Sequence, residues 1–241
     1  MSNASSILIA GAVGGIGSAV VDRALAQGYS VIALVRIWDQ RARDLQSRSG
    51  VLAVLDASQG APSASRLREA LGERSLSGFV WCVGVSEGGI TAEQTSTQWH
   101  KAFDVNVGLA MDLARVCFPL LQECRGSAVF VGSPVAMVGA RKVAYAASKA
   151  ALIGLVAALS AEWAPRGVRV NGIVPGATRT PMTADWSHEK RAAVASTIPL
   201  GRMAEAAEMA GPIAFLLSPD ASFMTGAWLN VTGGAYPGVG A

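Results

Sequence analysis

The sequence has few of the residues that bind metals or form disulfides. Its 241 residues include two histidines and three cysteines, and Cys82, Cys117 and Cys124 lack the paired spacing of a metal-binding motif. We therefore expect no metal site and reduced thiols. Charged residues make up only 15% of the chain, and no basic stripe interleaved with aromatic side chains is present, so the net charge of +3 does not predict a nucleic-acid partner. A phosphate-bearing small molecule explains the positive excess more simply.

Segments that would direct the chain to a membrane are also lacking. Met1–Ser6 is small and polar and has no basic flank, so it does not resemble a signal peptide. The most apolar helical stretch is interrupted by Lys149 and Glu162. No uninterrupted apolar run approaches the roughly 18 residues of a membrane span. We expect no membrane partner and a cytoplasmic location.

Apolar residues are plentiful, at 51% of the chain, which is enough to bury the core of one α/β domain over residues 1–241. Apolar runs that predict buried strands alternate with segments of helical spacing, without a linker or repeat. The predicted strands are 7–10, 29–35, 51–55, 79–83, 128–131, 168–174 and 227–231, and helical patterns cover 18–27, 99–124 and 144–164. This alternation predicts a single Rossmann-type doubly wound parallel sheet with helices on both faces, whose ligands bind beyond the carboxyl ends of the strands.

A glycine-rich turn follows the first predicted strand and precedes the first predicted helix. Gly11, Gly15 and Gly17 have the spacing GxxxGxG. Glycine is needed in such a turn because a Cβ would keep the backbone N–H groups from a pyrophosphate and the helix from the strand. Packing of small residues alone would also explain the motif. Its place between a strand and a helix favours nucleotide binding.

The second predicted strand ends at Val35 and is followed by Arg36. An NAD-selective site carries a carboxylate at this end to accept the ribose hydroxyls, whereas a guanidinium pairs with the 2′-phosphate of NADP(H). The sequence therefore predicts NADP(H) in preference to NAD(H). A solvated surface arginine is the alternative, and Arg41 or Arg43 could share the role. Asp56, after the third strand, could accept a hydrogen bond from the adenine amino group or cap a helix.

Tyr145 and Lys149 lie four residues apart in a helical pattern, so both side chains share one face. A free tyrosine has a pKa of about 10, and a neighbouring ammonium favours its ionised form. Ser133 follows the strand 128–131 and can hydrogen-bond a substrate oxygen. The tyrosine–lysine pair alone occurs on many helices by chance. Together with the serine, the glycine-rich turn and the arginine, it predicts proton transfer by Tyr145.

These motifs resemble the short-chain dehydrogenase/reductase family over essentially the whole chain. The matching residues are Gly11, Gly15, Gly17, Asn106, Ser133, Tyr145, Lys149, Asn171, Pro175–Gly176, Thr225–Gly226 and Gly233–Gly234. The resemblance implies that Tyr145 is the acid/base, that Ser133 orients the carbonyl, and that Lys149 lowers the tyrosine pKa and binds the nicotinamide ribose. It implies a water held by Asn106 in the proton relay, although local hydrogen bonding would also explain that asparagine.

The resemblance also implies cofactor contacts and an assembly. The cofactor contacts, besides the three glycines, Arg36, Asp56, Tyr145 and Lys149, are Ile16, Gly84, Pro175, Gly176, Thr178 and Thr180. A homotetramer, or a homodimer, is implied as well. Trp81-Cys82-Val83-Gly84 keeps only the glycine of the family's Asn-Asn-Ala-Gly, and Ala10 replaces its usual threonine. These departures concern the adenine side rather than the chemistry.

A variable substrate lid is implied at about 180–199. Its Met182 and Trp186 suit an apolar substrate, while we take His188 as a surface residue. The opposite wall would be lined by Pro134, Val135, Met137 and Val138. We expect an NADP(H)-dependent oxidoreductase that moves a hydride between the nicotinamide and a small, largely uncharged ketone or secondary alcohol, such as a 3-oxoacyl thioester, a diketone or a cyclic ketone. A dehydratase or epimerase on the same scaffold and a non-catalytic NADP-binding sensor are the alternatives.

Overall fold

A computed structural model gives the structure of the protein and describes residues 5–236. Residues 1–4 and 237–241 lie outside the described residues. The first of these ranges belongs to the segment Met1–Ser6, which is predicted not to be a signal peptide. Seven parallel strands form one sheet in the order β3-β2-β1-β4-β5-β6-β9. They are β1 (Ser5–Ala10), β2 (Ser30–Val35), β3 (Val51–Asp56), β4 (Ser75–Trp81), β5 (Ser127–Val131), β6 (Arg169–Pro175) and β9 (Trp228–Val231).

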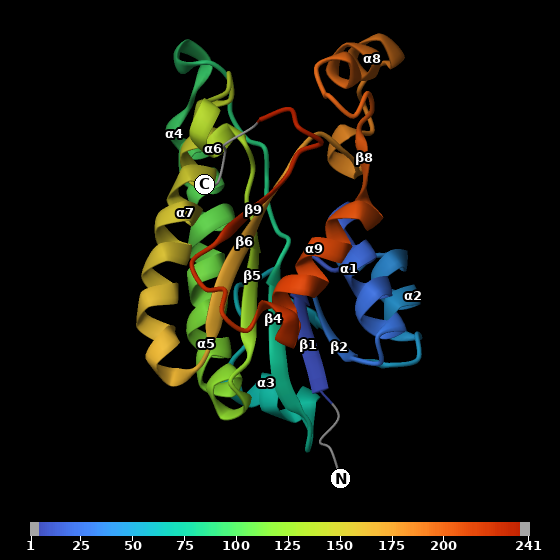
Figure 1. The fold of residues 1–241 in the computed structure, drawn as a ribbon, viewed down its shortest axis with the longest axis vertical. Coiled ribbons are helices and arrows are strands. Elements are labelled where there is room, and N and C mark those ends of the chain that lie inside the picture. The colour runs from blue at the N-terminus through green and yellow to red at the C-terminus, as the bar shows by residue number, and fades with distance from the viewer. Residues whose placement is uncertain (1–4, 237–241) are drawn as a thin grey trace.

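Helices cover both faces of the sheet, which confirms the predicted doubly wound architecture (Figure 1). One face carries α1 (Gly15–Ala26), α2 (Gln40–Gln46) and α9 (Ala206–Leu217). The other carries α3 (Ala64–Leu71), α5 (Leu109–Cys124) and α7 (Val143–Trp163). The shorter α4 (Ser96–Phe103), α6 (Val135–Val138) and α8 (His188–Ser196) lie beyond the carboxyl ends of the strands, at the top of the molecule in Figure 1.

The strands are apolar on both sides because each face of the sheet is buried. Within β1, Leu8 faces the core under α5 and α7, whereas Ile7 and Ile9 face the core under α1 and α9. Strand order reverses between β1 and β4, each of which leads into a crossover on a different side. This switch point places the turns after β1 and β4 next to each other, where ligands of such sheets bind.

The predicted helix 99–124 is divided in the structure. It consists of α4, a π-helical segment Asp104–Gly108 and α5. The predicted strand 79–83 begins earlier, at Ser75, and ends at Trp81, so that Cys82 and Val83 already belong to the turn beyond the sheet. Helices α3 and α9, and the two-residue strands β7 (Thr178–Arg179) and β8 (Ala204–Glu205), were not predicted.

Helix α7 is long and apolar enough, by length and composition, to cross a membrane, and in residues 5–236 it is the one helix that passes this test. Its buried side chains Leu152, Val156, Leu159 and Trp163 pack into the core on the sheet. A buried core helix passes the same test, so this helix adds no support for a membrane partner.

Candidate active site

Two adjoining cavities lie beyond the carboxyl ends of the strands. The first cavity, of about 550 Å³, is lined by the segments that follow β1, β2 and β3 and by the start of α5. The second cavity, of about 480 Å³, is lined by the segments that follow β5 and β6 and by α7. Both share a border made of Gly14, Arg36, Cys82, Val83 and Gly84. An elongated ligand can therefore extend from one cavity into the other.

The glycine-rich turn lies at the border between the two cavities. Gly11 lines the first cavity with a φ of +79°, a conformation that side chains rarely adopt. Gly15 and Ile16 line the second cavity, and a Cβ on Gly15 would lie 2.6 Å from the Thr180 side chain. Gly17 lines neither cavity; its Cβ would lie 2.1 Å from the Gly11 carbonyl oxygen, so its role is to let α1 approach the turn.

The start of α1 fits an anionic group. The helix has no side-chain cap: Gly14 occupies the N-cap position and makes no side-chain hydrogen bond. Unpaired N–H groups at a helix N-terminus favour a bound phosphate. The turn is thus a backbone cradle of the kind that a Cβ would fill, and a dinucleotide pyrophosphate fits it.

Arg36 borders both cavities, and its side chain is exposed. The predicted pairing with the 2′-phosphate of NADP(H) requires this position. None of the ion pairs in residues 5–236 includes it. Arg41 also lines the first cavity, but its guanidinium lies 2.7 Å from the Asp39 carboxylate. Arg43 does not line the cavity and donates to Gln40. Among residues 5–236, Arg36 is therefore the arginine at this border whose guanidinium forms no ion pair.

Asp56 is not among the residues that line the first cavity. Its carboxylate accepts a 2.7 Å hydrogen bond from the Ser58 N–H, and this bond lowers its pKa. Ala57 and Ser58 line the cavity instead. An aspartate directly after a strand forms such a local turn readily, because its carboxylate reaches the N–H two residues on. In the structure Asp56 neither lines the first cavity nor caps a helix, since the N-cap of α3 is Ser63; it forms a local turn instead.

The segment after β4 carries the departures from the family pattern. Trp81 is fully buried in the core under α5 and α7, away from the cavities, and its indole nitrogen has no hydrogen-bond partner. Cys82 lines both cavities, and burial raises the pKa of its thiol to about 12, against the effect of the nearby Lys149 ammonium. A Cβ on Gly84 would lie 3.2 Å from Lys149 Nζ, so glycine leaves room for the ammonium.

Ser133, Tyr145 and Lys149 line the second cavity together. Ser133 follows β5, while the other two lie one turn apart on α7. Lys149 is only 4% exposed, and its Nζ donates a 3.0 Å hydrogen bond to the Val131 carbonyl. Burial lowers the pKa of Lys149 to about 8. The three predicted residues are therefore brought to one place by β5 and α7.

The pKa of Tyr145 is raised in the structure, whereas a lowered pKa was predicted. Burial raises it above its ordinary value, and interaction with the Ser133 side chain lowers it by less. The decrease expected from the Lys149 ammonium is not found. The Lys149 ammonium is instead directed to the Val131 carbonyl, and removal of Tyr145 from water disfavours the phenolate. In this structure Tyr145 therefore holds its proton firmly at neutral pH.

Asn106 lies in the π-helical segment and is fully buried. Its Oδ1 accepts from the Val85 N–H at 2.8 Å, and its Nδ2 donates to the Val85 carbonyl at 3.1 Å and to Ser148 Oγ at 2.8 Å. Ser148 Oγ in turn donates to the Tyr145 carbonyl. The amide therefore joins the segment after β4 to α7 through residues 21 and 42 positions away, which is not the local hydrogen bonding weighed for it, and its relay role stays a prediction. Short π-helical insertions recur at functional sites.

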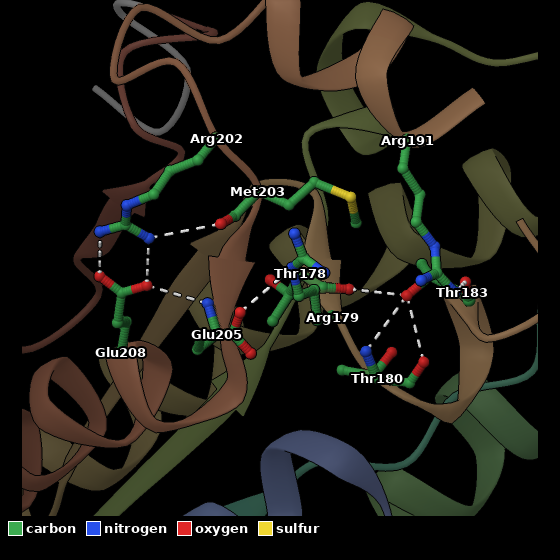
Figure 2. A network of polar contacts seen from close by, with 9 residues as sticks. All are labelled: Thr178, Arg179, Thr180, Thr183, Arg191, Arg202, Met203, Glu205 and Glu208. Carbon is green, nitrogen blue, oxygen red and sulfur yellow. Dashed lines mark hydrogen bonds and ion pairs between the residues drawn. The ribbon is translucent and has the colours of Figure 1, made fainter. Parts of the chain in front are cut away.

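The predicted contacts after β6 form one side of the second cavity. Pro175, Gly176, Thr178 and Thr180 all line it. Figure 2 shows how polar contacts hold this segment: Thr183 Oγ1 lies 3.0 Å from the Thr178 carbonyl and accepts from the Thr180 N–H. Arg191 of α8 donates to the Thr183 carbonyl, which ties this helix to the same segment. These contacts hold the start of the predicted lid at about 180–199.

A second group of contacts in Figure 2 holds the other side of this base. The Arg202 guanidinium pairs with both carboxylate oxygens of Glu208 at 2.6 and 2.7 Å, and this pairing lowers the pKa of Glu208 to about 2. Glu208 also accepts from the Glu205 N–H at 2.9 Å, and Arg179 pairs with Glu205 at 3.1 Å. These contacts join β8 to β7 and to the start of α9.

The lid residues are only partly brought to the cavity. Met182 lines the second cavity, but Trp186 and His188 do not, and neither do Pro134, Val135, Met137 and Val138. The expected opposite wall is therefore not formed by α6 in this structure. Sequence reasoning missed several lining residues: Ala57, Ser58, Asp112, Gly132, Ala177 and Thr183. Inspection of every residue beyond a strand end would have found all of these except Asp112, which comes from α5, and Thr183.

No group of three or more metal-binding side chains occurs in residues 5–236. The three cysteines are free in the structure.

The chain is similar to known reductases along almost its whole length. A family model described as enoyl-(acyl carrier protein) reductase matches residues 11–236. The 3-oxoacyl-(acyl-carrier-protein) reductase FabG of Salmonella typhimurium is 31% identical over 237 residues, which cover 95% of this chain and 96% of the relative. The acetoacetyl-CoA reductase of an Acinetobacter strain is 31% identical over 246 residues and covers 98% and 99%.

Two solved structures are also similar to this chain along almost its whole length. An oxidoreductase of the short-chain dehydrogenase/reductase family from Burkholderia thailandensis matches with a TM-score of 0.87 and 28% identity, covering 98% of this chain and 93% of that one. A short-chain dehydrogenase/reductase from Brucella melitensis matches with a TM-score of 0.84 and 32% identity, covering 97% of each chain.

Proposed function

Since the chain belongs to the short-chain dehydrogenase/reductase family of oxidoreductases, we propose that it is an NADP(H)-dependent ketoreductase. The observation that carries this proposal is the convergence of Ser133, Tyr145 and Lys149 on a cavity that adjoins the glycine-rich turn. A binding module would need the turn but no proton-transfer group. The residues 1–241 would act as one domain, with the lid at about 180–199.

The cofactor would occupy both cavities. Its adenosine end would lie in the first cavity, with the 2′-phosphate against Arg36, and its pyrophosphate at the start of α1. The nicotinamide end would lie in the second cavity, between Ile16, Gly176 and Thr180. When bound, NADP(H) supplies or accepts the hydride. Relatives named as 3-oxoacyl and acetoacetyl-CoA reductases support a keto group as its partner.

The side chains of the second cavity would transfer the proton to the substrate. In the direction of reduction, Ser133 donates a hydrogen bond to the carbonyl oxygen and Tyr145 delivers its proton to that same oxygen. A tyrosine whose pKa is raised by burial is protonated before the reaction, as this direction requires. The Lys149 ammonium donates to the Val131 carbonyl in this structure, and it would favour the phenolate once the proton has left by turning from that carbonyl toward Tyr145, because an opposite charge stabilises an ionised group in a low dielectric.

The substrate would be small and largely uncharged, of the 3-oxoacyl thioester, diketone or cyclic ketone type. The lining of the second cavity includes two cations, Arg36 at its border and the buried Lys149, and both are assigned to the cofactor. Apolar surface at its mouth comes from Met182, which is 54% exposed. This supports a neutral, partly apolar substrate.

A substrate panel tests the proposal against its alternatives. NADPH oxidation is followed with 3-oxoacyl thioesters, diketones and cyclic ketones, for the wild type and for Ser133→Ala. We expect turnover with one of these classes that falls at least tenfold in the variant. Turnover of a hydroxyacyl substrate without net change of the cofactor would indicate a dehydratase or epimerase. Tight NADPH binding without turnover of any substrate would indicate a sensor.

We also propose a cytoplasmic homotetramer, or a homodimer. Helix α7 leaves Ala150, Ala157 and Ala158 exposed, and α5 leaves Met111 40% exposed. Apolar helix faces of this kind favour burial against another subunit. Light scattering at micromolar concentration is expected to give the mass of four chains or of two. The mass of one chain would contradict this assembly.

A further inference from the structure

We propose that Trp228, on the edge strand β9, is a positioning residue that holds the end of β5 and thereby Ser133; this role rests on the function proposed above. Trp228 does not line either cavity. It would act through the backbone of Gly132, the residue between β5 and Ser133. The indole ring covers two glycines, Gly132 and Gly172.

The Trp228 ring lies flat across two strands. Trp228 pairs with Gly172 of β6 in the parallel register, and its ring occupies the space of a side chain there: a Cβ on Gly172 would lie 2.4 Å from two ring carbons. The ring extends further to β5, where a Cβ on Gly132 would lie 2.5 Å from Cζ3. Both positions must be glycine for the ring to lie there, since Cβ contacts below 3.0 Å are not tolerated.

The segment that carries Ser133 is held from three directions. The Gly132 N–H donates to the Ile173 carbonyl at 2.9 Å, and the Val131 carbonyl accepts from Lys149 Nζ at 3.0 Å. The Trp228 ring closes the remaining side, from the core under α5 and α7. Gly132 itself lines the second cavity, so its opposite side faces the reaction site. A movement of Gly132 toward the core would draw Ser133 away from Tyr145.

Close packing makes this contact effective. Gly132 has no side chain of its own to fill the space beneath it, so the ring alone prevents the strand end from relaxing into the core. A displacement of about 1 Å at a reacting group can cost up to about a hundredfold in rate. The predicted consequence is a loss in turnover without a loss in cofactor affinity, because Trp228 is not among the residues that line the two cavities.

Trp228→Leu tests the role of the ring. We expect kcat to fall about tenfold, with the dissociation constant of NADPH changed less than twofold. In a Ser133→Ala background the same substitution is expected to cost less than twofold, because the group that it positions is gone. An equal loss in both backgrounds would overturn the proposal. Trp163→Leu is the matched control: this tryptophan is buried in the same core but stacks on Phe118, and should lower stability without the loss in kcat.

Gly132→Ala tests the same contact by adding a methyl group at the glycine, and unlike Trp228→Leu it leaves no empty space in the core. Its added methyl group would meet the ring, so kcat should fall about tenfold. Combination with Trp228→Leu, which makes room for the methyl group, should restore part of that loss relative to Gly132→Ala alone. A double variant no better than Gly132→Ala would contradict the coupling.

A titration of Tyr145 separates this proposal from the proposed function, because it needs no substrate. Phenolate absorbance is followed with pH, and Tyr145→Phe supplies the background of the other two tyrosines. Trp228→Leu should raise the Tyr145 pKa as far as Ser133→Ala does, and the two together should raise it no further. An unchanged pKa in Trp228→Leu would overturn the positioning role even if carbonyl reduction is confirmed. If no carbonyl compound is reduced, the proposed function fails and the titration still decides about Trp228.

Discussion

The two adjoining cavities have similar volumes but different chemistry. The first, of about 550 Å³, has exposed charged side chains in its lining, Arg36 and Arg41, and Arg41 pairs with Asp39. The second, of about 480 Å³, contains a lysine that is 4% exposed and a tyrosine whose pKa burial raises. The first cavity therefore presents charged groups that are exposed to water, whereas the second contains ionisable groups that are largely withdrawn from water.

Under the proposed function, this contrast separates cofactor selectivity from reaction rate. An exposed cation is screened by salt and solvent, so Arg36 would favour one cofactor over another by roughly one order of magnitude. Groups withdrawn from water interact in a lower dielectric, so Tyr145 and Lys149 would change the barrier by several orders. Substitutions at the two ends should therefore separate binding from chemistry.

The largest separation is expected from Tyr145→Phe. The substitution removes only the hydroxyl that carries the proton, so kcat should fall by about 10²–10⁴ while NADPH affinity stays within a fewfold of wild type. Turnover is measured with saturating cofactor, and affinity by quenching of protein fluorescence. Retention of more than about a tenth of wild-type turnover would show that another group transfers the proton.

Lys149→Ala should lower both the turnover and the affinity for the cofactor. One ammonium is expected both to stabilise the phenolate and to hold the cofactor, so kcat should fall about a hundredfold and NADPH affinity should weaken as well. Lys142→Ala is the control, since this lysine is exposed and donates to the Ser86 carbonyl outside the cavities. If Lys149→Ala lowered kcat alone, the contact with the cofactor would be excluded.

Replacement of Val35 by Asp together with Arg36 by Leu should change the choice of cofactor and leave the chemistry intact. The wild type is expected to show at least about a tenfold higher kcat/KM with NADPH than with NADH, which corresponds to one charged hydrogen bond. The double variant should prefer NADH, because the new carboxylate accepts the ribose hydroxyls and repels the phosphate. Equal use of both cofactors by the wild type would refute the role of Arg36. The kcat of the double variant with its preferred cofactor should stay near that of wild type.

The smallest effect is expected from pH. Burial lowers the pKa of Lys149 to about 8, so its ammonium is present below pH 8 and is lost as the pH rises through that value. Reductive kcat/KM should therefore fall severalfold between pH 7 and 9, while Tyr145, with its raised pKa, keeps its proton over this range. The decrease should be absent in Lys149→Ala. A decrease of the same size in that variant would assign it to another group.

The sequence predicted the parts of this site that depend on local spacing. Tyr145 and Lys149 share a helix face because they are four residues apart, and Ser133 and Arg36 follow buried strands whose carboxyl ends meet at one edge. These relations need no knowledge of distant contacts. The doubly wound sheet was predicted for the same reason, since alternation of apolar strands and helices is visible along the chain.

Features that depend on tertiary contacts could not be predicted. The π-helical segment around Asn106 interrupts a continuous helical pattern, and no residue in it signals the change. The wall that α5 gives to the first cavity and the pairing of β7 with β8 both follow from the packing of segments that are distant in the sequence. The raised pKa of Tyr145 likewise depends on burial, which the four-residue spacing to Lys149 does not report.

Transfer of deuterium from NADPH labelled at the reactive carbon of the nicotinamide tests the central claim most directly. The reaction is run with a 3-oxoacyl thioester or another substrate that supports NADPH oxidation, and the product is analysed by mass spectrometry. The account predicts one deuterium on the carbon that bears the new hydroxyl, at a rate that Tyr145→Phe lowers at least a hundredfold. A product formed without deuterium at that carbon would contradict it.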